Sequence, residues 1–103
     1  MDAEGDMPAS VLFACTMNAV RSPMAEGILK HLAGHRIRVA SAGMRAGQAD
    51  PYAIAVMDEI GIDISDHEPR RFSAIGDEVY ELIVTLSPEA HHHAVELTRI
   101  MPA

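Results

Sequence analysis

A short apolar stretch followed by a proline-led helical pattern occurs three times along this chain, and this alternation constrains the fold more than any other feature. The apolar stretches are SVLFAC at 10–15, RIRVASAG at 36–43 and YELIVTL at 80–86. The pairs that follow them are Ser22-Pro23, Asp50-Pro51 and Ser87-Pro88. Ser or Asp before proline is typical of a helix N-cap and first helical residue. The sequence therefore predicts strands and helices in strict alternation.

Buried parallel strands read as continuous apolar runs, and right-handed connections between them place helices on both faces of the sheet. We therefore predict a three-layer α/β domain with a short parallel sheet in the order 2-1-3. Residues 10–103 are expected to form this single domain, and residues 1–9 are expected to form a flexible N-terminal tail. A further short helix is expected near residues 72–76.

Apolar residues at helical spacing predict which helix faces are buried. The first helix is expected from Pro23 to Gly34, the second from Pro51 to about Ile60, and the third from Ser87-Pro88 onward. Their expected inner faces are Met24, Ile28 and Leu32; Ala53, Met57 and Ile60; and Ala90, Ala94, Leu97 and Met101. The methionines at 24, 44, 57 and 101 are predicted to fill the core.

The composition argues against several classes of function. The 103 residues suffice for one domain, and their formal charge of −7 at pH 7 argues against a broad nucleic-acid surface. No apolar run is long enough to cross a bilayer, and the acidic N-terminus lacks the basic start of a signal peptide. The single cysteine excludes an internal disulfide and fits a reducing compartment, so we predict a cytoplasmic location.

The one cysteine, Cys15, lies where the first strand is expected to pass into the first helix. A helix N-terminus offers unpaired N–H groups and the positive end of a dipole, which bind anions and favour a thiolate. Arg21, six residues further on, is placed to turn two planar donors toward a tetrahedral oxyanion. The alternative is a small, buried, chemically inert cysteine. The combined spacing favours nucleophilic attack by Cys15.

The segment from Cys15 to Glu26 has the pattern C-x5-R-S-P-M-A-E, which resembles the signature of low-molecular-weight protein tyrosine phosphatases and the arsenate reductases related to them. The preceding VLFAC and the later SAG, GIDISDH and IVTL segments extend the resemblance from about residue 10 to residue 98. The resemblance implies a phosphatase-I-like, flavodoxin-like fold with no cofactor and no metal. It also implies hydrolysis of phosphotyrosine or small aryl phosphates.

The resemblance implies roles for three residues around the reacting centre. Cys15 would form a phosphocysteine intermediate, Arg21 would hold the phosphoryl oxygens, and Ser22 would donate its hydroxyl to the departing sulfur. The ligands implied are oxyanions such as phosphate, sulfate or arsenate. Residues implied to contact the substrate are Thr16, Met17, Asn18, Ala19 and Val20 in the loop, with Tyr52, near Gln48, on one wall of the cleft.

The resemblance also implies a supporting network around Asn18. This asparagine would adopt a left-handed backbone conformation, which asparagine tolerates better than most residues. Ser22, Ser41 and His67 would steady it with hydrogen bonds.

Three features depart from the family pattern. Met17 stands in place of the usual glycine, and Val20 stands where many members carry a second cysteine. The family's general acid is an aspartate in an Asp-Pro pair after a fourth strand, so the domain is expected to be incomplete at its C-terminal end and impaired by about 10²–10⁴ in rate. Asp50, in the one Asp-Pro pair, is expected to be an N-cap instead; Asp63 and Asp66 are weaker candidates for the acid.

Without a fourth strand, the third strand would be a bare sheet edge, and such edges recruit other strands. We therefore expect self-association of the chain through this edge. His91, His92 and His93 are expected to be incidental surface imidazoles, because consecutive helical residues point about 100° apart and cannot share one ion well. Arg70 and Arg71 are expected to be solvated loop charges.

Three functional hypotheses remain from the sequence. The first is a cysteine-dependent phosphatase for phosphotyrosine proteins or small aryl phosphates. The second is a domain that binds oxyanions without turnover. The third is an arsenate reductase that uses an external thiol, because a single cysteine excludes a relay through several internal cysteines.

Overall fold

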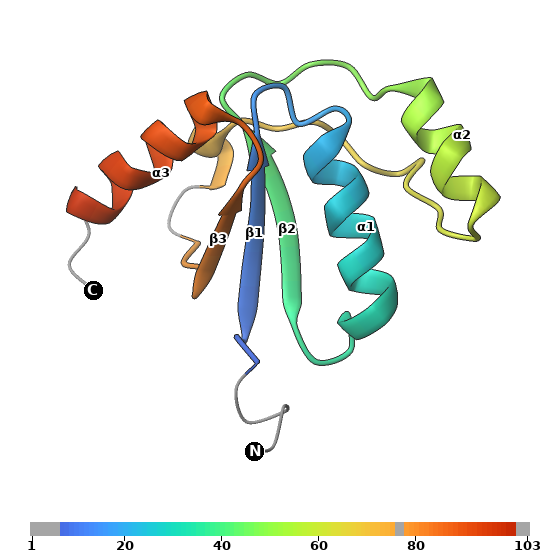
Figure 1. Ribbon diagram of the computed structural model, residues 1–103, viewed down its shortest axis with the longest axis horizontal. Helices are drawn as coiled ribbons and strands as arrows, with labels where there is room; N and C mark the ends of the chain where they lie inside the picture. The colour runs from blue at the N-terminus through green and yellow to red at the C-terminus, as the bar shows by residue number, and fades with distance from the viewer. Residues whose placement is uncertain (1–6, 76–77, 101–103) are drawn as a thin grey trace.

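The computed structural model describes residues 7–75 and 78–100, with side chains through residue 95. Its elements are β1 (Ser10–Cys15), α1 (Arg21–Ala33), β2 (Arg38–Gly43), α2 (Pro51–Glu59), the 3-10 helix η2 (Phe72–Ile75), β3 (Leu82–Thr85) and α3 (Pro88–Ile100) (Figure 1). The predicted alternation and the short helix after residue 71 are therefore confirmed. The expected core positions at Leu97 and Met101 lie outside the described side chains, and residue 76 lies outside the described chain.

The three strands are parallel and lie in the order β2-β1-β3, as predicted. β1 pairs with β2 along its whole length, from Ser10 opposite Arg38 to Cys15 opposite Gly43. Its pairing with β3 is shorter and runs from Val11 to Ala14. β1 is thus the central strand, and its C-terminal residue, Cys15, lies between the ends of its two neighbours.

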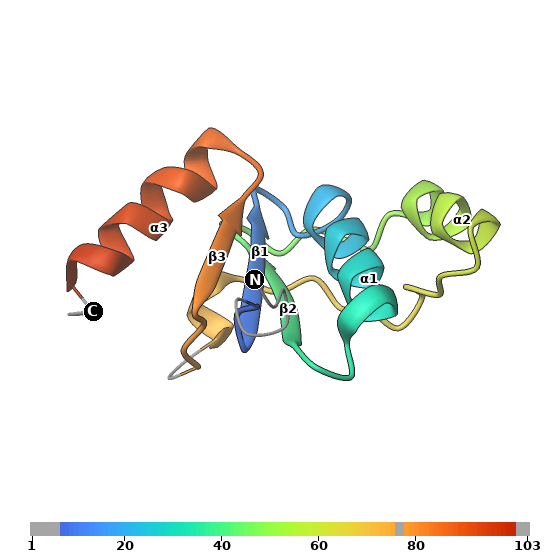
Figure 2. The ribbon, with the colours of Figure 1, turned by 60° about the horizontal axis from the view of Figure 1, so that its bottom comes forward.

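Successive side chains of β1 enter two apolar cores, one on each face of the sheet, because strand side chains alternate. The core beneath α1 contains Val11, Ala33, Ile37 and Val39, with Phe13, Leu29 and Val84 packed against it. The core on the other face contains Leu12, Ala14, Ala42, Phe72, Ile75 and Ala90. Figure 2 shows α1 and α3 on opposite sides of β1, so the predicted three-layer arrangement is confirmed.

The second helix packs against α1 and the segment after α2 rather than against the sheet. Ala53, Met57, Ile62 and Ile64 form a third buried cluster, against which Met24 packs. A Cβ on Gly27 would lie 2.7 Å from Ile64 Cγ2, so glycine at this position of α1 permits the close contact. Figure 1 shows α2 on the far side of α1 from the sheet.

This two-sided packing of α1 makes part of the predicted helix faces wrong. Ile28 is 39% exposed and Leu32 is 68% exposed, whereas Leu29 and Ala33 face the sheet. In α2 the predicted Ala53 and Met57 are buried, but Ile60 is 60% exposed. The spacing gave the correct period, but the partners on each side of the helix decided which residues were covered.

Two of the three predicted N-caps are confirmed. The Asp50 side chain accepts hydrogen bonds from the N–H groups of Tyr52 and Ala53, and Ser87 Oγ accepts one from Ala90 N. The prediction for Ser22 is wrong, because α1 already begins at Arg21 and its N-cap residue, Val20, makes no side-chain cap. The Ser22 hydroxyl is bound elsewhere, as described below.

Ala9, the last residue of the expected N-terminal tail, makes two backbone hydrogen bonds. The N–H of Ala9 donates to Glu81 Oε2 at 2.7 Å, and its carbonyl accepts from Arg38 N at 3.0 Å. Among the described residues, no helix is both long and apolar enough to span a bilayer.

Candidate functional site

The loop at residues 16–20, between β1 and α1, is fastened to the chain that follows β2. Met44 N donates to Cys15 O, Arg45 N donates to Thr16 O at 2.8 Å, and Gly47 N donates to Met17 O at 2.9 Å. A Cβ on Gly43 would lie 2.7 Å from Asn18 N and 2.9 Å from Thr16 O. Only glycine at this position lets the end of β2 approach the loop so closely.

Cys15 is buried at 3% exposure at the end of β1, and its sulfur has two polar neighbours. Ser22 Oγ lies 2.8 Å from Sγ, and Asn18 N donates to Sγ at 3.2 Å. The N-terminal turn of α1 follows directly after the loop. An amide N–H donated to a sulfur, with a hydroxyl in hydrogen-bond contact and a helix N-terminus beside it, suits a negative charge there.

Asn18 is the central residue of a buried hydrogen-bond network. Its φ of 52° is the left-handed value implied by the family resemblance, and its side chain is fully buried. Asn18 Nδ2 donates to Ser22 Oγ at 2.8 Å and to Ser41 Oγ at 2.9 Å. Its backbone carbonyl lies 3.0 Å from His67 Nε2. The structure therefore brings together the polar residues that the sequence singled out around this loop.

Sequence reasoning missed two members of this network, Glu26 and Arg70. Ser41 Oγ donates to Glu26 Oε1 at 2.5 Å, and Lys30 Nζ lies 2.7 Å from Glu26 Oε2. Arg70 N donates to Asn18 Oδ1 at 2.8 Å, so Arg70 is not merely a solvated charge. For Glu26 the i,i+4 spacing to Lys30 was an available signal. For Arg70 no local pattern existed.

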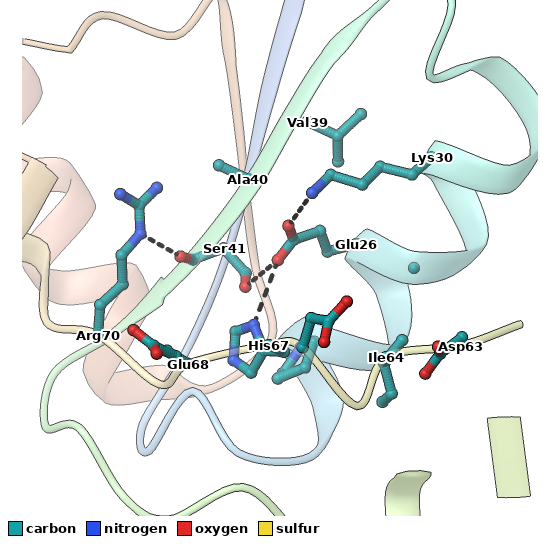
Figure 3. A pocket seen from close by; sticks show the side chains of 13 residues that line it. Glu26, Lys30, Val39, Ala40, Ser41, Asp63, Ile64, His67, Glu68 and Arg70 are labelled. Carbon is teal, nitrogen blue, oxygen red and sulfur yellow. Dashed lines mark hydrogen bonds and ion pairs between the residues drawn. The ribbon is translucent and has the colours of Figure 1, made fainter. Parts of the chain in front are cut away.

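A cavity of about 390 Å³ opens behind this network, between α1, β2 and residues 63–70. Figure 3 shows Glu26, Ser41, His67 and Arg70 along its wall, with Lys30 at one side. His67 Nδ1 lies 3.8 Å from Glu26 Oε1, so the imidazole stands between this carboxylate and the loop. The cavity is therefore the rear side of the loop's support rather than its opening.

Arg21 lies at the start of α1 and is tied to the end of β3. Its Nη1 donates to the carbonyl of Leu86 at 2.7 Å, and its side chain is exposed. In the loop itself Met17 is 42% and Val20 is 40% exposed, whereas Thr16 and Ala19 are half-buried. The exposed side of the loop is therefore partly apolar, with a guanidinium at one end.

The remaining candidate residues lie on α2 and on the segments before and after it, outside the loop. Tyr52 is 82% exposed in the first turn of α2, and Gln48 is also exposed. Asp63 accepts hydrogen bonds from the hydroxyl and the N–H of Ser65, which lower the pKa of its carboxyl and make it a poor proton donor. Asp66 lines the rear cavity.

The histidines of α3 have different partners, although the rings of His91 and His92 also meet edge to face with centroids 6.4 Å apart. His91 Nδ1 lies 3.3 Å from Thr85 Oγ1, and the His93 ring packs against Phe72 with centroids 4.7 Å apart. Within the described part of the chain, no three His, Cys, Asp or Glu side chains gather in a group that could hold a metal ion.

Comparison with known proteins gives consistent matches. The family described as low molecular weight phosphotyrosine protein phosphatase matches residues 10–102. The glutaredoxin arsenate reductase of Synechocystis sp. is 38% identical over 76 residues, which are 74% of this chain and 58% of that protein. A solved arsenate reductase in the phosphate binding state is 37% identical, with a TM-score of 0.71 and coverage of 76% of this chain and 60% of that one.

A solved protein tyrosine phosphatase is similar over more of the chain. It is 32% identical with a TM-score of 0.77, and the match covers 92% of this chain and 66% of that one. The chain thus spans about three fifths of the length of the proteins it matches.

Proposed function

Because the chain belongs to the low molecular weight phosphotyrosine protein phosphatase family, we propose that it is a cysteine-dependent enzyme that acts on tetrahedral oxyanions. We further propose that its reaction is the reduction of arsenate by an external thiol. The observation that carries the proposal is the buried Cys15 sulfur, with the Asn18 N–H and the Ser22 hydroxyl directed at it. The choice of arsenate is supported by the Synechocystis relative and the solved structure that are named arsenate reductases.

Each part of the loop has a role in this proposal. Cys15 is the nucleophile, the N–H groups from Thr16 to Arg21 surround the oxyanion, and the Arg21 guanidinium holds two of its oxygens. Ser22 stabilises the thiolate by donating to it. The side chains of Asn18, Ser41 and His67 position the loop and do not touch the oxyanion.

The proposed reaction balances with two equivalents of thiol. The Cys15 thiolate attacks arsenic, and one arsenate oxygen takes up a proton and leaves as water. A first external thiol attacks the Cys15 sulfur, so the sulfur–arsenic bond breaks and its electron pair reduces arsenic to arsenite. A second external thiol attacks the mixed disulfide and releases Cys15 as a thiolate. In sum, one arsenate and two thiols give arsenite, one disulfide and water.

The external thiol follows from the cysteine content. Cys15 is the only cysteine in these 103 residues, so within them no second thiol can resolve the intermediate. Because both the nucleophile and the reductant must remain reduced, we propose a reducing compartment, the cytoplasm, as the place of action.

The test is arsenate-dependent oxidation of a small thiol such as glutathione, or of a reduced glutaredoxin. The full chain should produce arsenite in proportion to the disulfide formed, and Cys15→Ser should abolish both products. Ser65→Ala is the control, because the Ser65 hydroxyl is bound to Asp63 in the loop after α2. Arsenite production that survives Cys15→Ser would disprove the role of the cysteine.

Phosphomonoester hydrolysis is the second candidate. It is favoured by the phosphatase match over 92% of the chain and by exposed Tyr52, which could stack on an aryl group. Hydrolysis of p-nitrophenyl phosphate without thiol-dependent arsenate reduction would select it. Binding of phosphate with neither activity would select a domain that only binds oxyanions.

A further inference from the structure

Arg70 touches the supporting network at three points, although its sequence context gave no hint of this. Its N–H donates to Asn18 Oδ1 at 2.8 Å, and its Nε donates to the Ser41 carbonyl at 3.0 Å. Its own carbonyl accepts from Gly43 N at 2.9 Å. Figure 3 shows the guanidinium reaching Ser41 at the edge of the rear cavity. Arg70 is therefore bound both to Asn18 and to the strand that carries one of its partners.

The Arg70 N–H determines which way the Asn18 amide faces. An amide has one side that only accepts hydrogen bonds and one that only donates. A backbone N–H cannot accept, so the side of Asn18 that faces Arg70 must be its oxygen. Nδ2 then faces the hydroxyls of Ser22 and Ser41, where both of its hydrogens are used.

This orientation sets the direction of the hydroxyl hydrogens. Because Ser41 Oγ accepts from Asn18, its own hydrogen is free to go to the Glu26 carboxylate at 2.5 Å. Because Ser22 Oγ also accepts from Asn18, its hydrogen is free to go to Cys15 Sγ at 2.8 Å. With the amide reversed, both hydroxyls would donate to Asn18, and the sulfur would lose its hydroxyl donor.

We propose that Arg70 is a positioning residue that sets the direction of this network and so keeps the Ser22 hydroxyl donating to Cys15. The inference rests on the proposed role of Cys15 as the nucleophile. The guanidinium contributes by anchoring the N–H, since it binds Ser41 O and lies 3.6 Å from Glu78 Oε2.

The experiment measures the rate at which iodoacetamide alkylates Cys15 as a function of pH. Loss of a hydrogen bond to a charged group changes the equilibrium between thiol and thiolate by about tenfold. Ser22→Ala should therefore slow alkylation at pH 7 about tenfold and move the rate profile to higher pH. Arg70→Pro, which removes the N–H, should do the same. Arg70→Gln keeps the N–H without its anchor and should have a smaller effect. The other titratable and charged groups on the elements around the sulfur, Arg21, Glu26, His67 and Arg45, are unchanged in every variant.

Arg71→Gln is the matched control, because the exposed Arg71 adjoins Arg70 and meets Gly43 only through its backbone. Its profile should equal that of the unmodified chain. The double variant Arg70→Gln/Ser22→Ala should react no more slowly than Ser22→Ala alone, because both changes remove the same donation.

Two results would overturn the inference. One is a folded Arg70→Pro variant with an unshifted profile; the other is full additivity in the double variant. If Arg70→Pro loses its folded circular dichroism spectrum, the comparison of Arg70→Gln, Ser22→Ala and their double variant decides the question. Because alkylation needs no substrate, a chain that neither reduces arsenate nor hydrolyses esters would disprove the proposed function and leave this test intact.

Discussion

The two edge strands of the sheet are held very differently. β2 pairs with β1 over six residues, and its last three residues, Ser41 to Gly43, are buried. β3 pairs with β1 over four residues, none of which is fully buried, and Leu82 is 46% exposed. α3 packs on β3 and β1 near its start and extends past the sheet edge (Figure 1).

The difference shows where the loop around Cys15 obtains its rigidity. Ser41, Gly43, Arg45 and Arg70 all come from β2 or from segments beside it, and they contact the loop directly. The β3 side contributes the Leu86 carbonyl, which binds the Arg21 guanidinium. Changes on the β2 side should therefore disturb the Cys15 sulfur, and changes on the β3 side should not.

Gly43→Ala should have the largest effect, because the new Cβ would press against two backbone atoms of the loop. We expect a loss of about 2 kcal/mol in the free energy of unfolding, measured in urea. Phosphate should also protect Cys15 from alkylation about tenfold less well.

Gly47→Ala is the matched control for that change. Its Cβ would lie 3.2 Å from Met17 Cε, which can rotate away, and 3.3 Å from Met17 Cβ, which are looser contacts than those at Gly43. Equal losses in the two variants would contradict the close approach of β2 as the cause.

Leu82→Lys tests the opposite edge and should have a smaller effect. A half-exposed edge position should change the free energy of unfolding by no more than about 0.5 kcal/mol, and Cys15 alkylation should not change. A lysine on a sheet edge opposes strand pairing, so concentration-dependent self-association in light scattering should fall. An unmodified chain that stays monomeric at every concentration would refute pairing through this edge.

Tyr80, just before β3, should give the smallest effect. Burial and the hydrogen bond to Glu78 raise the pKa of Tyr80 above its ordinary value of 10.0. The neutral phenol is therefore favoured in the fold, so its stabilisation is present below pH 10 and is lost as the pH rises through the raised pKa.

Tyr80→Phe should slightly flatten the decline of the melting temperature above pH 10 and leave Cys15 alkylation at pH 7 unchanged. An altered alkylation rate would show that the β3 side reaches the loop after all.

Much of the fold could be predicted because its signals are local. Each strand is a short apolar run, and Asp50 and Ser87 cap their helices with atoms two or three residues away. The left-handed Asn18 was found through the family signature, which fixes that position relative to Cys15. The predicted inner face of α1 failed because α2 and the segment after it pack on a second side of the helix. The predicted cap at Ser22 failed because its hydroxyl is bound by Cys15 and Asn18 of the preceding loop.

The sequence by itself determined the order of elements, the parallel sheet and the place of the one thiol, because apolar runs, proline-led helix starts and the loop spacing act over a few residues. Only the tertiary structure decided which side of α1 the second helix covers, and that Arg70 joins the network from 52 residues away. The physical reason is that a buried hydroxyl or amide must find a partner. That partner is supplied by whichever segment the completed fold places beside it.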